Sequence, residues 1–186
     1  MIMKKIAILV SILCIAFAAG AQPKFGIKSG KVNMAMNQMG QTISITMYFD
    51  DYGAKTASLI TAAGQDIKSV SDGNKTYVIN CADNTILQET ENTEASQIDF
   101  NNLTDEVKGK YKIKEMGTEE FLGKTCQSYS AVVEQQGFEA NVVYLIYKGI
   151  PLKTTTTIMG MSMVMEATSI EENIPVDPTL FEIPKK

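Results

Sequence analysis

Apolar and polar residues alternate along most of the chain, and residues 41–50 show the alternation most clearly. One side of this stretch carries four apolar residues, Ile43, Ile45, Met47 and Phe49, while the other side is polar. A repeat of two residues keeps side chains on one face of a strand, whereas a helix would scatter them. The stretch is therefore predicted to be an antiparallel strand with one buried face.

Similar short stretches recur at intervals of roughly ten residues, which is typical of an all-β domain. Turns rich in aspartate, asparagine and glycine separate several of them. Strands are predicted at residues 27–36, 41–50, 55–61, 67–70, 75–81, 85–89, 121–133, 138–147 and from Pro151 onward. Residues 89–109 are polar and acidic and lack the alternation. They are predicted to form a loop with a short helix at residues 102–108 that covers part of the sheet.

Residues 150–184 contain a threonine run, a Met-Gly-Met turn and methionines at every second position. The alternating methionines are Met159, Met161, Met163 and Met165. This spacing predicts a β-hairpin. An apolar closing segment follows it, with Leu180, Phe181 and Ile183.

Residues 1–21 have the pattern of a secretory signal peptide. A short basic start precedes an apolar run over residues 6–17, and small residues follow. The apolar run is shorter than the ~20 residues that span a bilayer. Cleavage is predicted between Ala21 and Gln22, which leaves a single domain over residues 22–186 without an integral membrane segment. The expected location is the periplasm or the outside of the cell.

Charge and composition exclude nucleic-acid binding. The chain has 17 basic and 21 acidic residues, and removal of Lys4 and Lys5 with the signal peptide leaves 15 basic residues and a net charge of −6. Neither arginine nor histidine occurs. Nucleic-acid binding requires a basic surface, usually with arginine, and the chain offers none.

No catalytic motif stands out. The chain has no histidine for general base catalysis, no nucleophile elbow, no zinc ligand set and no phosphate loop. The adjacent carboxylates of Asp50 and Asp51 are explained by a turn, because aspartate accepts hydrogen bonds from turn backbone. A hydrolase using only two carboxylates stays an alternative, but no pair of acids is distinguished. The sequence therefore predicts a protein that is not an enzyme and uses no cofactor.

Two cysteines, Cys81 and Cys126, remain after cleavage. An oxidising compartment permits a disulfide between them. Two separately buried thiols are the alternative, and the spacing leaves both open.

A lysine cluster follows the predicted helix, where Lys110, Lys112 and Lys114 alternate with Tyr111 and Ile113. The alternation predicts one solvated face of a strand. A patch for phospholipid headgroups is the alternative.

Nine of the eleven methionines lie after residue 21, and several share an apolar strand face. Three interpretations of this face are open. Thioethers fill irregular gaps in a core, they line adaptable grooves for apolar ligands, and pairs such as Met161 and Met163 are able to capture Cu(I). The groove hypothesis assigns its wall to Met34, Met36, Ile43, Ile45, Met47, Phe49, Met161, Met163 and Met165.

Three motifs resemble a family of secreted proteins of unassigned function. Residues 121–129 contain Gly-x-x-Cys-x-x-Tyr, residues 148–152 read Lys-Gly-Ile-Pro-Leu, and residues 169–184 end in Phe-Glu-Ile-Pro. The fold of this family is similar to that of LolA, the periplasmic carrier of outer-membrane lipoproteins, and of its receptor LolB. The resemblance covers most of the exported chain in strand order.

The resemblance implies a mainly β fold, a strongly curved antiparallel sheet in the form of an incomplete barrel (a LolA-like half-barrel) of about ten strands, with one or two short helices. The terminal Phe-x-x-Pro is expected to pack back onto the sheet. In the lipoprotein carriers the concave face holds acyl chains, but their functional arginine near the cavity entrance has no equivalent in this chain, which lacks arginine.

The predicted function is non-catalytic binding of an apolar small molecule, lipid or acyl chain in the concave face. The first alternative is an envelope protein–protein module, in which Thr154–Thr157 or another edge strand pairs with a protein partner. The second is methionine-based Cu(I) binding.

Overall fold

The structure, a computed structural model, describes residues 23–38, 41–62, 64–72, 75–92, 98–135 and 137–185. The predicted signal peptide and its cleavage site lie outside these residues. The strands are β1 (Gly30–Gln38), β2 (Gln41–Asp50), β3 (Lys55–Ala62), β4 (Gln65–Ser71), β5 (Lys75–Asn80), β6 (Thr85–Glu91), β7 (Lys114–Phe121), β8 (Lys124–Gln135), β9 (Phe138–Tyr147), β10 (Ile150–Ile158) and β11 (Met161–Glu172). The helical elements are η1 (Asp51–Gly53), α2 (Asp105–Lys110) and η3 (Pro178–Phe181).

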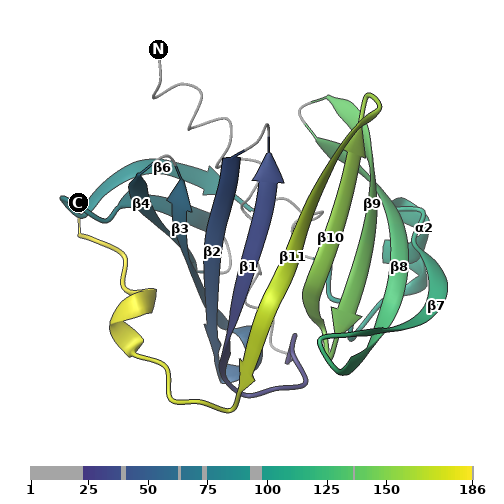
Figure 1. Ribbon diagram of the computed structural model, residues 1–186, viewed down its shortest axis with the longest axis horizontal. Helices are drawn as coiled ribbons and strands as arrows, with labels where there is room; N and C mark the ends of the chain where they lie inside the picture. The colour runs from purple at the N-terminus through teal and green to yellow at the C-terminus, as the bar shows by residue number, and fades with distance from the viewer. Residues whose placement is uncertain are drawn as a thin grey trace.

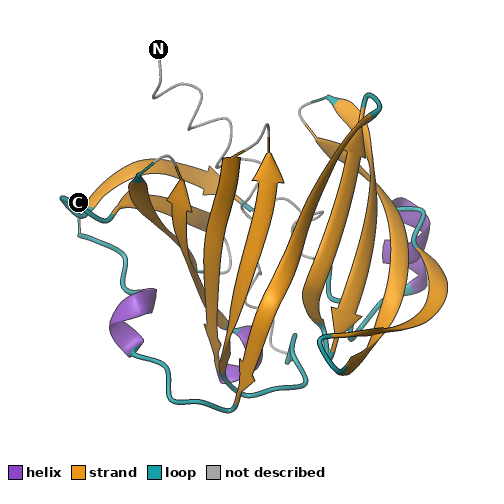
Figure 2. Cartoon of the chain, viewed as in Figure 1, coloured by secondary structure: helices purple, strands orange, loops and turns teal. Residues whose placement is uncertain are grey.

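The strands form one sheet of 11 strands in the order β6-β5-β4-β3-β2-β1-β11-β10-β9-β8-β7 (Figure 1). All neighbouring pairs are antiparallel. The sheet curves strongly, and β6 and β7 remain as its two edges, so it is not closed into a barrel (Figure 2). The predicted mainly β half-barrel with few short helices is therefore confirmed.

Three hairpins use the same two-residue turn, in which a residue with positive φ precedes a glycine with positive φ. The pairs are Leu122-Gly123, Lys148-Gly149 and Met159-Gly160. Such turns match the twist of the strands that they connect. The turn at Leu122-Gly123 corrects the prediction of one strand over residues 121–133, since β7 ends before it and β8 begins after it.

The sheet consists of a β1–β6 wing and a β7–β11 wing. β10 and β11 pair only from Lys153 to Ile158; beyond that, β11 continues beside β1 and β10 beside β9. Residues 23–29 join the wings at this divergence. The Phe25 N–H donates to the Tyr52 carbonyl (3.0 Å), and the Gly26 N–H donates to the Lys148 carbonyl (2.8 Å).

The main core lies on the face of the sheet that carries Met34 and Ile45, which is called the inner face below. It includes residues of both wings and of the segment 23–29. At its centre the rings of Phe25 and Phe49 meet edge to face, with centroids 5.1 Å apart. Gly30 allows this packing, because a Cβ there would lie 2.6 Å from the Phe49 ring.

The closing segment covers the outer face of the β1–β6 wing. Leu180, Phe181 and Ile183 pack against Ala57, Val70 and Ile79. Asp177 begins η3 by accepting the Thr179 N–H at 2.9 Å. The prediction that the terminal Phe-x-x-Pro packs back onto the sheet is confirmed.

The predicted short helix exists as α2, two to three residues later than expected. The Thr104 side chain accepts the Val107 N–H and caps it. The lysine prediction is partly wrong, because Lys110 ends this helix and only Lys114 belongs to a strand. Tyr111 and Ile113 are buried between them, so the alternation of burial arises from a turn rather than from a pleated strand.

Candidate functional site

Strand register brings all nine residues of the predicted wall onto the inner face. Residues directly opposite each other in paired strands share a face. Met34 lies opposite Ile45, and Met36 lies opposite both Ile43 and Met165. The remaining members follow at alternate positions along β2 and β11.

Burial divides this wall into two parts. The residues of β1 and β2 are core members with at most 5% exposure: Met34, Met36, Ile43, Ile45, Met47 and Phe49. On β11, Met161 is 66% exposed, Met163 and Met165 are half-buried, and Ala167 is buried. These three methionines form a row, called the methionine track below, that leads from the surface to the core. The ligand-binding role of the nine residues remains a prediction.

Uncharged residues flank the methionine track on β10 and β9. Thr154 lies opposite Met165, and Thr156 lies opposite Met163. Tyr144 follows opposite Thr154 on β9, and burial raises the pKa of its phenol to about 12. The phenol therefore stays neutral at physiological pH, and this part of the inner face carries no charge.

The hydroxyl of Thr154 is a polar atom on the inner face that sequence reasoning missed. The Thr154 side chain is buried, and its Oγ1 has no hydrogen-bond partner among the residues that the structure describes. Nearly all buried polar groups in proteins are hydrogen-bonded, and an exception requires an explanation. Only the threonine run marked this position, and its spacing does not distinguish a buried hydroxyl from an exposed one.

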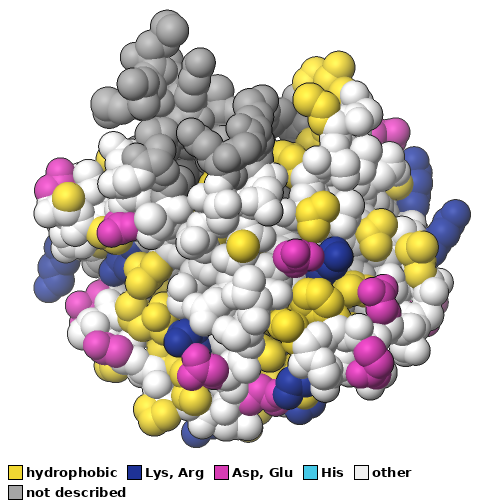
Figure 3. All heavy atoms as spheres, in the orientation of Figure 1, with side chains coloured by type: hydrophobic (Ala, Val, Ile, Leu, Met, Phe, Trp, Pro, Cys, Tyr) yellow, Lys and Arg dark blue, Asp and Glu magenta, His cyan; other side chains and the backbone are white. Residues whose placement is uncertain are grey.

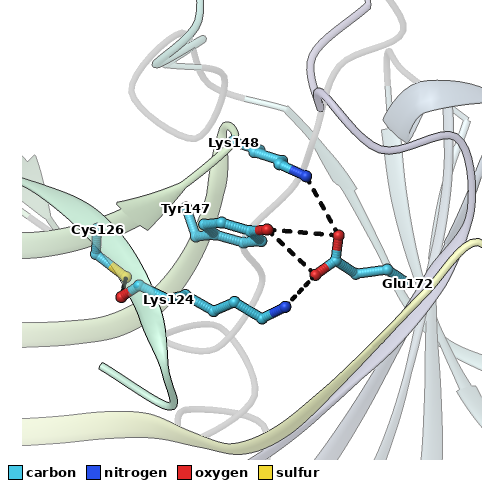
Figure 4. A network of polar contacts seen from close by, with 5 residues as sticks. All are labelled: Lys124, Cys126, Tyr147, Lys148 and Glu172. Atoms are coloured by element: carbon cyan, nitrogen blue, oxygen red, sulfur yellow. Dashed lines mark hydrogen bonds and ion pairs between the residues drawn. The ribbon is translucent and has the colours of Figure 1, made fainter. Parts of the chain in front are cut away.

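A charged network lies where β10 and β11 diverge (Figure 4). Glu172 at the end of β11 accepts hydrogen bonds from Lys124, from the Tyr147 hydroxyl (3.2 Å) and from Lys148 (3.3 Å). The two ammonium groups also lie 5.2 and 5.0 Å from the centroid of the Tyr147 ring. The hydrogen bond from Lys124 lowers the pKa of Glu172 most, with a further contribution from Lys148. The network ties the end of β11 to β8 and to the β9–β10 turn across the divergence.

Both cysteines are free thiols, so the structure contains no bridge between Cys81 and Cys126. Cys81 is exposed after β5, where it lines a 350 Å³ pocket with Asp66 and Leu87. Cys126 is buried in β8. Desolvation, partial for Cys81 and by burial for Cys126, raises the pKa of each thiol, which reduces its reactivity because the thiolate is the nucleophile.

The threonine run does not provide a sheet edge. Thr154–Thr157 pair with β11 on one side and with β9 on the other. The hypothesis that this strand pairs with a protein partner is therefore wrong, because its backbone groups are already hydrogen-bonded to strands on both sides. A role of another edge in binding a partner is confined to β6 and β7.

The described residues contain no group of three or more histidine, cysteine, aspartate or glutamate side chains arranged to hold a metal ion. Within the same residues, no helix has the length and apolar character to cross a bilayer. Asp50 acts as a turn residue, as predicted, since its side chain accepts the Asp51 N–H at 2.8 Å. Met161 and Met163 share a face of β11, and Cu(I) binding by this pair stays a prediction.

Comparison with known proteins shows that the fold of this chain is similar to those of solved structures. No family model matches the chain, and no curated protein matches it. An uncharacterized conserved protein from Thermus thermophilus superposes with a TM-score of 0.56 at 10% identity, over 86% of this chain and 88% of that one. The structure of MucB in complex with MucA(peri) superposes with a TM-score of 0.51 at 14% identity, over 86% of this chain.

This chain spans 55% of the length of the MucB structure. A putative outer membrane lipoprotein-sorting protein domain from Vibrio parahaemolyticus matches more loosely, with a TM-score of 0.39 at 12% identity over 83% of this chain and 89% of that one. The two structures with TM-scores above 0.5 share the fold. The strongly curved, open antiparallel sheet implied by the sequence motifs is confirmed by the strand order, which leaves β6 and β7 as two edges.

Proposed function

We propose that the protein binds an apolar, lipid-like molecule along the methionine track and catalyses no reaction on it, after export to the periplasm. The observation that carries the proposal is the change in exposure along β11. Met161 is 66% exposed and Ala167 is 3% exposed, with two half-buried methionines between them. An acyl chain that entered at Met161 would meet apolar side chains as far as the buried core.

Methionine suits such a ligand because its unbranched, polarizable side chain adapts to different apolar shapes. The inner-face residues of β9 to β11 beside the track carry no charge, so a hydrocarbon chain would desolvate no ionised group there. Glu172 is held instead by Lys124, Lys148 and Tyr147 at the divergence of the strands. The track therefore favours a hydrocarbon chain over an anionic solute.

Thr154 adds a polar contact to this site. Its unpartnered Oγ1 lies on the inner face opposite Met165. A hydroxyl donates one hydrogen bond and accepts others, so a carbonyl or carboxyl oxygen of the ligand would satisfy it. The ligand is accordingly expected to be amphipathic, with an oxygen-bearing group near Thr154.

Native mass spectrometry of the protein purified from cells without detergent tests the proposed function. We expect an adduct of lipid mass that organic extraction removes. A spectrum with only the unliganded mass, together with no binding of a fluorescent fatty acid in titration, would contradict the proposal.

The alternative of a protein-binding module rests on the two edge strands, β6, which pairs only with β5 and exposes Leu87, and β7, which pairs only with β8. Both edges carry a register shift, at Leu87 in β6 and between Glu115 and Gly117 in β7, and such irregularities hinder further pairing. The similar MucB structure was solved in complex with a partner. An adduct of polypeptide mass in the same native spectrum would favour this alternative.

Replacement of Thr154 by valine is expected to change stability and binding in opposite directions. Valine keeps the shape and removes the unpartnered hydroxyl, so the free energy of unfolding should rise by about 1 kcal/mol. Affinity for a fluorescent fatty acid should fall roughly fivefold, because one hydrogen bond to the ligand is lost. Urea denaturation and fluorescence titration measure the two effects.

Thr155→Val is the matched control, since Thr155 lies on the opposite face of the same strand. It should leave affinity unchanged. A Thr154→Val protein that binds as tightly as the parent would remove Thr154 from the site.

A further inference from the structure

The β10–β11 hairpin ends in exposed apolar residues. Met159 in its turn is 74% exposed and Met161 is 66% exposed. Phe138, which is 51% exposed, begins β9 beside this turn, because Ile158 at the end of β10 pairs with Ala140. These three residues are called the apolar tip below. Figure 3 shows hydrophobic side chains standing at this end of the β7–β11 wing.

The end of the hairpin that carries the apolar tip is uncharged. Residues 154–165 contain no ionisable side chain. The neighbouring β8–β9 hairpin contributes two carboxylates, Glu134 and Glu139, and Glu139 pairs with Lys112 at 3.5 Å. Insertion of the apolar tip into hydrocarbon would therefore desolvate no charge of its own hairpin. The adjacent carboxylates disfavour contact with an anionic surface.

The size of the apolar tip discriminates between partners. A stable protein–protein interface buries about 800 Å² on each partner. Three partly exposed side chains at the end of a hairpin provide much less than this area. A bilayer requires no matching surface, and apolar side chains enter its interface to a depth of ~5–10 Å. A protruding, uncharged tip therefore fits a bilayer better than a protein partner.

We propose that the apolar tip inserts into the surface of a zwitterionic phospholipid bilayer. Such docking goes beyond the proposed function, since a protein with an empty inner face would dock equally well. It also gives the methionine track a source of ligand. Met161 belongs to both surfaces, and Met163 and Met165 continue from it toward the core.

The absence of tryptophan from the chain allows a clean test. Met159→Trp places one fluorophore in the apolar tip of the full-length protein, at a residue outside the methionine track. The matched control is Met116→Trp on β7, since Met116 is also a well-exposed methionine (60%) on a strand outside the apolar tip. Each variant is mixed with phosphatidylcholine vesicles, with and without brominated acyl chains that quench inserted tryptophan. Local quenching reports insertion at the probe, whatever other part of the chain contacts lipid.

We expect the emission of the Met159→Trp variant to shift to shorter wavelength and to lose at least about half of its intensity with brominated lipid. The Met116→Trp variant should change little, and raising the salt concentration should leave the result unchanged, because insertion is apolar. The proposal is overturned if the Met159→Trp emission does not respond or if both variants are quenched equally. It is also overturned if quenching requires anionic lipid and disappears at high salt, since that result would assign docking to the lysine cluster. Fatty-acid titration of the same proteins reports the inner face separately.

Discussion

Replacement of Phe49 by alanine is expected to lower the free energy of unfolding by about 3–5 kcal/mol. Phe49 is completely buried and meets Phe25 edge to face. Truncation removes this contact and leaves a cavity between β2 and the segment 23–29. Urea denaturation followed by circular dichroism measures the loss, and the Tm should fall by roughly 10 °C.

Phe138→Ala is the matched control, because Phe138 is an exposed phenylalanine of the apolar tip. It should change the free energy of unfolding by less than about 0.5 kcal/mol. Equal losses for the two variants would mean that the inner face of β2 is not the core of the protein.

The alternation of residues predicted most of the sheet, because most strands have one face against the main core. Residues 41–50 were predicted as a strand with Ile43, Ile45, Met47 and Phe49 on its buried face, and all four are buried in β2. The prediction relied only on the period of two, which a pleated strand imposes on its side chains.

Errors arose where local pattern does not determine long-range pairing. The sequence allows the threonine run to form an edge strand, yet β10 lies between β9 and β11. Threonine is favoured in edge strands and in central strands alike, so composition cannot identify an edge. The lysine cluster alternates in burial without being a strand, because the turn after α2 places Tyr111 and Ile113 inside.

The sequence predicts which residues belong to the candidate site, but not which of them are buried core and which are exposed. Spacing placed the nine wall residues on one face of their strands. It could not show that β1 and β2 contribute core while Met161 stays exposed. This difference depends on what packs over each strand, and strand periodicity contains no such information. The unpartnered hydroxyl of Thr154 could not be predicted from the sequence for the same reason.

Replacement of Met163 by aspartate is expected to weaken binding of a fluorescent fatty acid by at least about tenfold, because a ligand would bury the new carboxylate against hydrocarbon without a partner. Met163 is half-buried in the middle of the methionine track. Its partial exposure lets the carboxylate reach water in the unliganded protein, so the fold should tolerate the change. Circular dichroism checks that it does.

Val164→Asp is the matched control, since Val164 is the next residue of β11, on the outer face and 37% exposed. Fluorescence titration of both variants beside the unmodified protein therefore tests most directly whether the inner face of β11 binds an apolar ligand. The account predicts a large loss of affinity for Met163→Asp and none for Val164→Asp. Equal affinities in all three proteins, or an equal loss in both variants, would contradict it.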